Sequence, residues 1–173
     1  MITKKDIVGA IVHEWNVAKF LAGKIPPDGF DYRPSEKQRS VIELMRYIVV
    51  MPMATLRGLL NESFSAGFRS YAEHANDMTP EQFPAMVDAA IAEFTAAVEG
   101  IDDEEFSTRM VALPTRQVMP LDVALMFTAV KWSASYKMQL FLYAKALGAS
   151  DMGTIQAWAG MDPQPRPEAA PAA

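Results

Sequence analysis

The chain of 173 residues contains two histidines and no cysteine, which limits the chemistry its side chains can perform. No thiolate nucleophile, redox pair, disulfide framework, iron–sulfur cluster or Cys-ligated zinc site can form. His13 and His74 are too far apart in sequence to make an HxxxH or HExxH metal pair. His13, beside Glu14, could act as a general base, because an unperturbed imidazole titrates near pH 6.5. No nucleophile motif such as GxSxG accompanies it, so a structural histidine is the favoured interpretation.

Two further groups of polar residues carry weaker signals. His74, with Glu73 and Asp77, could form an adventitious metal site, but its surroundings are typical of a surface loop or short helix. The acidic run from 102 to 105 lacks the spaced oxygen pattern of a calcium loop. It is better explained as the charged start of a helix.

Trp132 and Tyr136 form the most distinctive aromatic pair. Residues four apart on a helix project from the same face, so the indole and the phenol are expected to lie together. Each carries a donor that needs a partner when buried, and the pair could therefore line a small pocket. The alternative, which spacing alone favours, is that both are core residues with satisfied polar tips.

Three long helices are predicted before the segment that carries this pair. The first begins at a Thr3-x-x-Asp6 cap and ends at about Ala22, with Gly23 as its stop. The second begins at the Ser35-x-x-Gln38 capping box, and Pro52 is expected to kink or break it. The third begins at Thr79-Pro80-Glu81-Gln82 and ends at Gly100.

The fourth long helix is predicted from Pro120 and Asp122 to Leu147, with Gly148 as its stop. It carries two apolar stripes, which is expected of a central helix or of one that gives a face to another interface. The first stripe consists of Val123, Phe127, Val130, Ala134, Met138 and Phe141. The second consists of Leu125, Ala129, Trp132, Tyr136, Leu140 and Tyr143.

These elements predict an all-α protein, an up-down four-helix bundle with a short irregular or extended connector before the last long helix. Within the connector, residues 108–118 have enough Thr and Val for a short extended pair around Pro114-Thr115. We expect one domain over residues 1–160 and a flexible Pro/Ala-rich tail over 161–173.

Charge and hydropathy narrow the range of partners. The net charge of −5 opposes nucleic-acid binding, because phosphates would be repelled. The apolar stretch near the start is too short for a signal peptide, and the longest apolar run is about half a membrane span. A cytoplasmic protein that binds neither membranes nor nucleic acids is expected.

Three segments give the chain a resemblance to the DinB-like superfamily, also called YfiT-like. They are Asp31-Tyr32-Arg33-Pro34-Ser35 with Arg39-Ser40, the stretch 41–48 (VIELMRYI), and the stretch 132–140 (WSASYKMQL) with its continuation to Leu147-Gly148. The resemblance covers roughly residues 5–150. It implies a four-helix bundle, often a homodimer, in which many members hold a divalent metal with three histidines. Thiol-dependent transfer and metal-dependent hydrolysis or isomerisation are among the family's activities.

The chain departs from the family pattern at every metal ligand. Tyr47 occupies the position of the second-helix histidine, and Trp132 and Tyr136 occupy those of the HxxxH pair on the last long helix. An indole and a phenol with a pKa of about 10 are poor ligands for zinc or nickel at neutral pH. No metal and no other cofactor is therefore expected. The three aromatics either fill the former metal cavity or line a hydrophobic pocket.

The resemblance leaves function open between two hypotheses, beside a third in which the protein is a purely structural dimer. In the first, the protein has lost the metal-dependent activity and binds a small molecule or a partner, as a homodimer. In the second, it is a divergent thiol-dependent transferase or hydrolase that uses the bundle cavity; catalytic residues are not identifiable, and without cysteine the thiol would be external. The candidate pocket neighbours are His13, Glu43, Arg46, Lys131 and Gln139.

Overall fold

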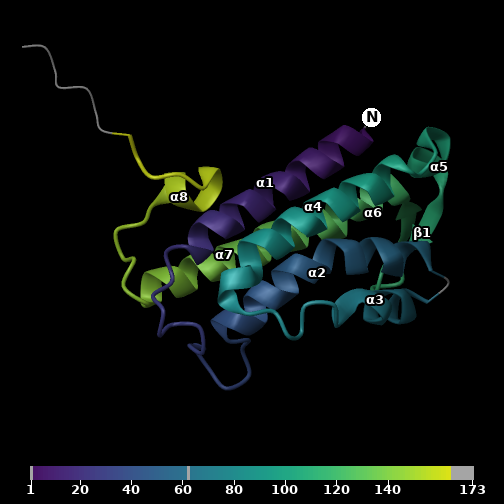
Figure 1. The fold of residues 1–173 in the computed structure, drawn as a ribbon. Helices are drawn as coiled ribbons and strands as arrows, with labels where there is room; N and C mark the ends of the chain where they lie inside the picture. The colour runs from purple at the N-terminus through teal and green to yellow at the C-terminus, as the bar shows by residue number, and fades with distance from the viewer. Residues whose placement is uncertain (1, 62, 165–173) are drawn as a thin grey trace, which may run out of the picture.

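A computed structural model describes residues 2–61 and 63–164, and it is an all-α bundle of four long antiparallel helical segments (Figure 1). The first and second segments each pack against the third and fourth, so the four enclose a single apolar core. The segments are α1 (Lys4–Ala22), α2 (Val41–Leu60), α4 (Phe83–Glu99), and the last one, made of α6 (Leu121–Leu125), η2 (Met126–Val130) and α7 (Lys131–Ala146).

Shorter elements connect or cover the long helices. The predicted extended pair is confirmed as an antiparallel hairpin in which Val111 opposes Met119. The acidic run begins a helix, as predicted, with the Asp102 carboxylate accepting hydrogen bonds from two backbone amides of the first turn. The short elements are α3 (Phe64–Ala72), η1 (Pro80–Gln82), α5 (Asp103–Thr108), β1 (Met110–Ala112), β2 (Val118–Pro120) and α8 (Thr154–Ala159).

The caps predicted for the first and third long helices are confirmed. Thr3 and Asp6 form a reciprocal capping box at the start of α1, and Gly23 is its C-cap. Thr79 and Gln82 form the corresponding box before α4, which passes through the single 3₁₀ turn η1 and ends at Gly100. In both helices local sequence and packing favour the same boundaries.

The predicted start of the second helix at Ser35 is wrong. The helix begins at Val41, where Ser40 and Glu43 form the capping box and the buried Ser40 side chain accepts from the Glu43 amide. The Ser35 hydroxyl instead donates to the Gln38 side chain within an exposed turn. The Ser40 box is favoured because Glu43 is also held by Arg33 of the preceding linker.

The break predicted as one outcome at Pro52 does not occur, since α2 continues through it to Leu60. A proline removes the hydrogen bond to the carbonyl four residues earlier, which here belongs to Ile48. The indole Nε1 of Trp15 on α1 donates to that carbonyl at 2.9 Å. The buried carbonyl therefore has a partner from another helix, which offsets part of the cost of the proline.

The last long segment contains one π-helical turn, η2, which the sequence pattern did not predict. A π turn changes the spacing of the residues that face the core. Phe127, predicted on an apolar stripe, is 56% exposed, whereas Thr128 and Ala129 beside it are buried. Further along, Leu140, Phe141 and Tyr143 are buried as predicted. The two predicted stripes therefore describe the end of the segment better than its beginning.

Two short helices on the outside of the bundle, α3 and α8, were not predicted. The helix α3 lies against α2, and Gly67 makes this possible, because a Cβ there would lie 2.4 Å from the Arg57 carbonyl oxygen. The helix α8 packs on α1. The predicted tail at 161–173 falls outside the described residues except for 161–164, where Asp162 pairs with Lys24. Among the described helices none is long and apolar enough to cross a membrane.

Candidate functional site

Two of the three aromatic residues that the sequence analysis placed at former metal-ligand positions contact each other. Tyr47 on α2 and Tyr136 on α7 are half-buried, and their rings meet edge to face with centroids 4.8 Å apart. Phe68 of α3 also approaches Tyr47, with a centroid distance of 6.4 Å. The phenols therefore pack together where α2, α3 and α7 come close, and this contact occupies part of the space between the helices.

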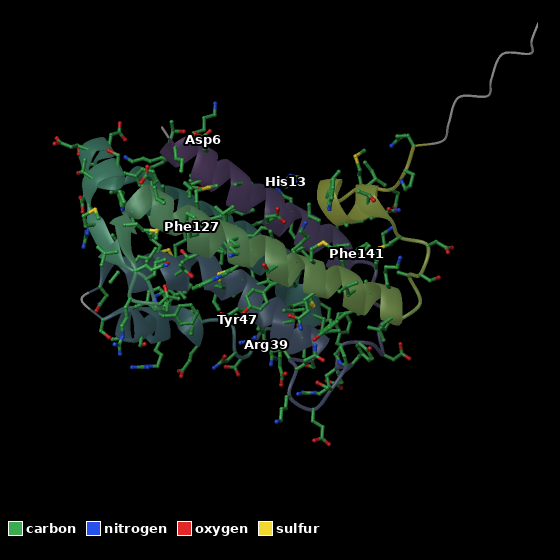
Figure 2. The ribbon with its side chains drawn as sticks, turned by 180° about the vertical axis from the view of Figure 1, so that it is seen from behind. Asp6, His13, Arg39, Tyr47, Phe127 and Phe141 are labelled. Carbon is green, nitrogen blue, oxygen red and sulfur yellow. The ribbon has the colours of Figure 1, made fainter. Side chains whose placement is uncertain are left out.

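Arg39 covers this aromatic pair from the linker before α2 (Figure 2). Its guanidinium carbon lies 4.0 Å from the centroid of the Tyr47 ring and 5.8 Å from that of Tyr136. The backbone of Arg39 is fixed as well, because the Tyr143 hydroxyl donates to its carbonyl at 3.0 Å. Gln139 in turn donates to the Tyr143 hydroxyl at 2.5 Å. Two residues of α7 thus hold Arg39 in position over the tyrosines.

A cleft of about 200 Å³ opens beside Tyr47, between α2 and the end of α3. The sequence had indicated Tyr47, Glu43 and Arg46 as candidate site residues, and the structure brings these three together in its wall. The lining residues are Arg39, Glu43, Arg46, Tyr47, Ala72 and Asn76. Two guanidinium groups, one carboxylate, one phenol and one carboxamide thus meet in a small volume.

The charge of Glu43 is already balanced. Its carboxylate accepts from the Ser40 backbone amide at 2.8 Å and pairs with Arg33 at 3.1 Å. The Ser40 amide and then the Arg33 guanidinium hold the pKa of Glu43 below its usual value. Glu43 is therefore a structural anion that closes the helix cap.

Arg46 is held through one nitrogen only. Its Nε donates to the carbonyl of Met78 at 3.0 Å, which fastens the loop after α3 to α2. Within residues 2–61 and 63–164, no hydrogen bond from its two terminal nitrogens is present. The guanidinium therefore fixes one wall of the cleft through Nε and leaves its two terminal nitrogens available as hydrogen-bond donors.

Tyr47 is a neutral hydrogen-bonding group under ordinary conditions. Burial raises its pKa to about 12, and the neighbouring phenol of Tyr136 adds to the effect, while the Arg39 cation opposes it. The phenol therefore keeps its proton at neutral pH and can donate to a ligand as well as accept.

The remaining predicted site residues lie outside the cleft. Trp132 is half-buried one turn before Tyr136, yet among the described aromatic rings it pairs with neither tyrosine. Lys131 is exposed on α7. His13 lies on α1, across α7 from Tyr47 in the view of Figure 2, and contacts the Trp158 carbonyl at 2.6 Å. Gln139 acts on the cleft only through Tyr143 and Arg39.

Sequence reasoning missed Arg39 and Asn76 as lining residues. Because the second helix was predicted to start at Ser35, Arg39 was placed within a helix rather than immediately before the cap residue Ser40. The Ser40-x-x-Glu43 spacing was the signal that could have corrected this. For Asn76 the sequence offers no signal, because the loop after α3 reaches the cleft only through tertiary packing.

A second polar cluster lies between α1 and α7, under α8. Lys137 is 4% exposed, and its ammonium lies 3.1 Å from the Glu14 carboxylate and donates to the Ala157 carbonyl at 2.8 Å. Glu14 Oε2 accepts no hydrogen bond, although it lies in the ion pair. The buried hydroxyl of Ser133, one turn before Lys137, also has no hydrogen-bond partner among the described residues. Its contacts join α1, α7 and α8.

His74 belongs to a surface network rather than to a metal site. Its ring stacks on Tyr71 with centroids 4.2 Å apart, and the Tyr71 hydroxyl donates to Glu93 of α4. Burial, followed by that hydrogen bond, raises the pKa of Tyr71. Arg57 lies over the same ring and 3.5 Å from the Glu93 carboxylate. These contacts fasten α3 to α4.

Three hollows larger than the Tyr47 cleft, of about 500, 550 and 280 Å³, lie elsewhere on the surface. The first is an open acidic surface at α5, where Arg109 is already paired with Glu105. The second and third lie along and at the start of α1, where Lys4 is paired with Asp103. None of the three has two cationic side chains without an ion-pair partner among the described residues, as the Tyr47 cleft has in Arg39 and Arg46, so the charged groups rather than the volume identify the candidate site.

Comparison with known proteins supports the architecture. No family model and no curated protein matches the chain. Among solved structures, the crystal structure of a DinB-like protein from Bacillus subtilis, YjoA, is similar with a TM-score of 0.58 and 20% sequence identity. The match covers 86% of this chain and 96% of that one. The fold is therefore DinB-like. At 20% identity the likeness establishes the fold alone, so the function has to be argued from the residues of the site.

The donor set of this DinB-like bundle does not fit the three-histidine metal of the family. At two of the positions where the sequence resemblance expects former metal ligands, the rings of Tyr47 and Tyr136 pack together with Arg39 above them. A cationic guanidinium 4.0 Å from the ring would oppose a divalent cation. Within the described residues, no three His, Asp or Glu side chains are arranged to hold a metal.

Proposed function

We propose that this DinB-like protein binds a small molecule in the cleft beside Tyr47 and has no metal-dependent activity. The observation that carries the proposal is the convergence of Arg39, Arg46 and Tyr47 on one small cleft, with donors that the described residues leave unused. Binding sites are typically concavities in which a few polar groups converge from a rigid scaffold. Here two helices and a capped linker supply that scaffold.

Binding is favoured over the alternative of a divergent transferase or hydrolase. The lining residues of the cleft include no Ser, Cys or His that could act as a nucleophile or as a base near neutral pH. The nucleophile would have to come from outside the protein, as an external thiol for transfer or as water for hydrolysis. The cleft offers groups that orient and hold a ligand.

The binding proposal is tested by filling the cleft. Ala72 is half-buried and lines it, whereas Ala66 is exposed on the same helix, so Ala72→Leu and Ala66→Leu add the same volume to one helix inside and outside the cleft. A fragment set of small acids, amines, amides and alcohols is screened by ligand-observed NMR. Compounds that bind the wild type and A66L but not A72L support the proposal. If A72L binds everything that the wild type binds, the cleft is not the binding site.

The metal-free state is tested separately by elemental analysis of protein purified without a histidine tag. The expected result is less than about a tenth of an equivalent of zinc, nickel or iron, because the aromatic positions offer no imidazole. One equivalent of tightly bound metal would contradict this part of the proposal.

We also propose that the protein is a cytoplasmic homodimer, on the basis of the resemblance to the DinB-like superfamily. Light scattering at micromolar concentration checks the assembly, with an expected mass of twice the 19.1 kDa chain. A mass of 19.1 kDa would contradict the dimer and leave the cleft proposal unaffected, because one chain supplies all the residues that line the cleft.

A further inference from the structure

We propose that the ligand of the Tyr47 cleft is a small oxyanion, a carboxylate or a phosphate, bound between the guanidinium groups of Arg39 and Arg46. This inference rests on the proposed binding function and adds the chemical class of the ligand. It follows from the charge balance of the cleft, the fixed position of Arg39 and the free nitrogens of Arg46.

The charge balance leaves the cleft cationic, although the whole chain carries a net charge of −5. Of the charged residues that line it, Arg39 and Arg46 are positive and Glu43 is negative. Glu43 is neutralised from outside the cleft by Arg33 and by the Ser40 amide. Neither Arg39 nor Arg46 has an ion-pair partner among the residues that the structure describes. An anion would supply the missing countercharge.

Arg39 is fixed in place before any ligand arrives. Its guanidinium lies 4.0 Å from the Tyr47 centroid, and its carbonyl accepts from Tyr143. A guanidinium that rests on an aromatic face keeps its edge nitrogens free for bidentate bonds to a carboxylate or a phosphate. Less side-chain entropy is then lost on binding than with a freely moving arginine.

Arg46 presents a second set of donors from the second turn of α2, whereas Arg39 lies just before that helix. Its Nε is engaged by the Met78 carbonyl, which leaves the terminal nitrogens as the end that can bind a ligand. The neutral Tyr47 phenol and the Asn76 carboxamide contribute further donors to the same cleft. Hydrogen bonds from charged donors to an oxyanion are about twice as strong as those between neutral groups.

The volume of the cleft sets an upper limit on the ligand. At about 200 Å³ it is smaller than the 300–1,000 Å³ typical of sites for drug-sized molecules. It can enclose an anionic head group, with any larger part of the ligand projecting outward. The inference therefore concerns the anionic group.

Sodium acetate and inorganic phosphate are the probes, each titrated at constant ionic strength into the full-length protein and followed by amide NMR shifts. The variants are Arg39→Gln and Arg46→Gln, with Arg69→Gln as the matched control, because Arg69 is exposed on α3 and does not line the cleft. All three remove one positive charge, so a general loss of electrostatic attraction affects them equally. Acetamide serves as the uncharged counterpart of acetate.

Saturable shifts at residues 39–47 and 72–76 with acetate or phosphate, and none with acetamide, are expected. R39Q and R46Q should each bind about tenfold more weakly, and R69Q as well as the wild type. Saturation by acetate alone identifies a carboxylate, and saturation by phosphate alone identifies a phosphate.

Four results would overturn the inference. Equal binding by R39Q, R46Q and the wild type would remove the arginines from the site, and an equal loss in R69Q would reduce the effect to net charge. Neutral fragments that A72L excludes, with no binding of either anion, would refute the oxyanion and leave the binding proposal standing. If A72L excludes no compound of any class, both proposals fail.

Discussion

The indole of Trp15 donates a hydrogen bond to the carbonyl of Ile48, four residues before Pro52 on the neighbouring helix. That carbonyl is the one that a proline at position 52 leaves without its helical amide partner. One tryptophan on α1 therefore makes a buried proline compatible with a continuous α2. Trp15 and Pro52 are both buried. The hydrogen bond from Trp15 joins α1 and α2, which share few other contacts.

Replacing Trp15 by Phe should cost less free energy of unfolding in a Pro52→Ala background than in the wild type. In the wild type the Ile48 carbonyl loses its donor, whereas in the P52A background the residue at position 52 supplies a backbone amide. The difference between the two costs is expected to be about 1–2 kcal/mol, measured by a double-mutant cycle with denaturant unfolding. Equal costs in both backgrounds would show that the indole acts only through packing.

Replacing Lys137 by Met should destabilise the protein by about 3 kcal/mol or more, because it leaves Glu14 charged and largely buried. The double variant Glu14→Gln with Lys137→Met removes both charges and should recover most of the loss. Denaturant midpoints of the four proteins measure this. Additive losses in the double variant would mean that the two side chains act independently.

Replacing Ser40 by Ala should lower the free energy of unfolding by about 1 kcal/mol, because the hydroxyl caps α2. Ser35→Ala is the control, since Ser35 lies in an exposed turn and should change stability by less than about 0.5 kcal/mol. Thermal or denaturant unfolding gives the loss of stability in each variant, and so compares the observed cap at Ser40 with the cap that the sequence predicts at Ser35. The opposite order of effects would place the start of the helix at Ser35.

The ionisation of Tyr47 should make alkaline stability depend on this residue. Its pKa is about 12 in the folded protein against an ordinary value of 10.0, so folding favours the protonated phenol. The stabilising contribution is complete below about pH 10 and is lost as the pH rises towards 12. The ultraviolet absorbance of phenolate, compared between the wild type and Tyr47→Phe, follows the transition directly. A Tyr47 component that titrates at the ordinary value would refute this.

Local signals predicted the first and third long helices, because each starts at a single capping box and ends at a glycine. The second helix was misplaced because Ser35-x-x-Gln38 and Ser40-x-x-Glu43 compete within a few residues. The choice between them depends on Arg33 and on burial of Ser40, which are tertiary facts. The continuity through Pro52 depends in the same way on Trp15, which lies on another helix.

The candidate site was predicted only in part, for a related reason. Spacing placed Trp132 beside Tyr136, yet the ring that meets Tyr136 is Tyr47 of another helix. The resemblance to the DinB-like superfamily identified that pair, since it supplied a three-dimensional arrangement that periodicity lacks. Arg39 could not be added from either source, because its place over the tyrosines depends on where α2 begins.

The π-helical turn at Met126–Val130 has a consequence for how such a site can change. It lies before Tyr136 in the same continuous segment, and a single-turn π bulge amounts to one extra residue in an α-helix. Because the wider π turn accommodates the extra residue, deleting one residue there would convert the turn to an α-helix and leave the two ends of the segment close to their present angular relation. The length of the segment before Tyr136 can therefore change by one residue without replacing a single side chain of the cleft.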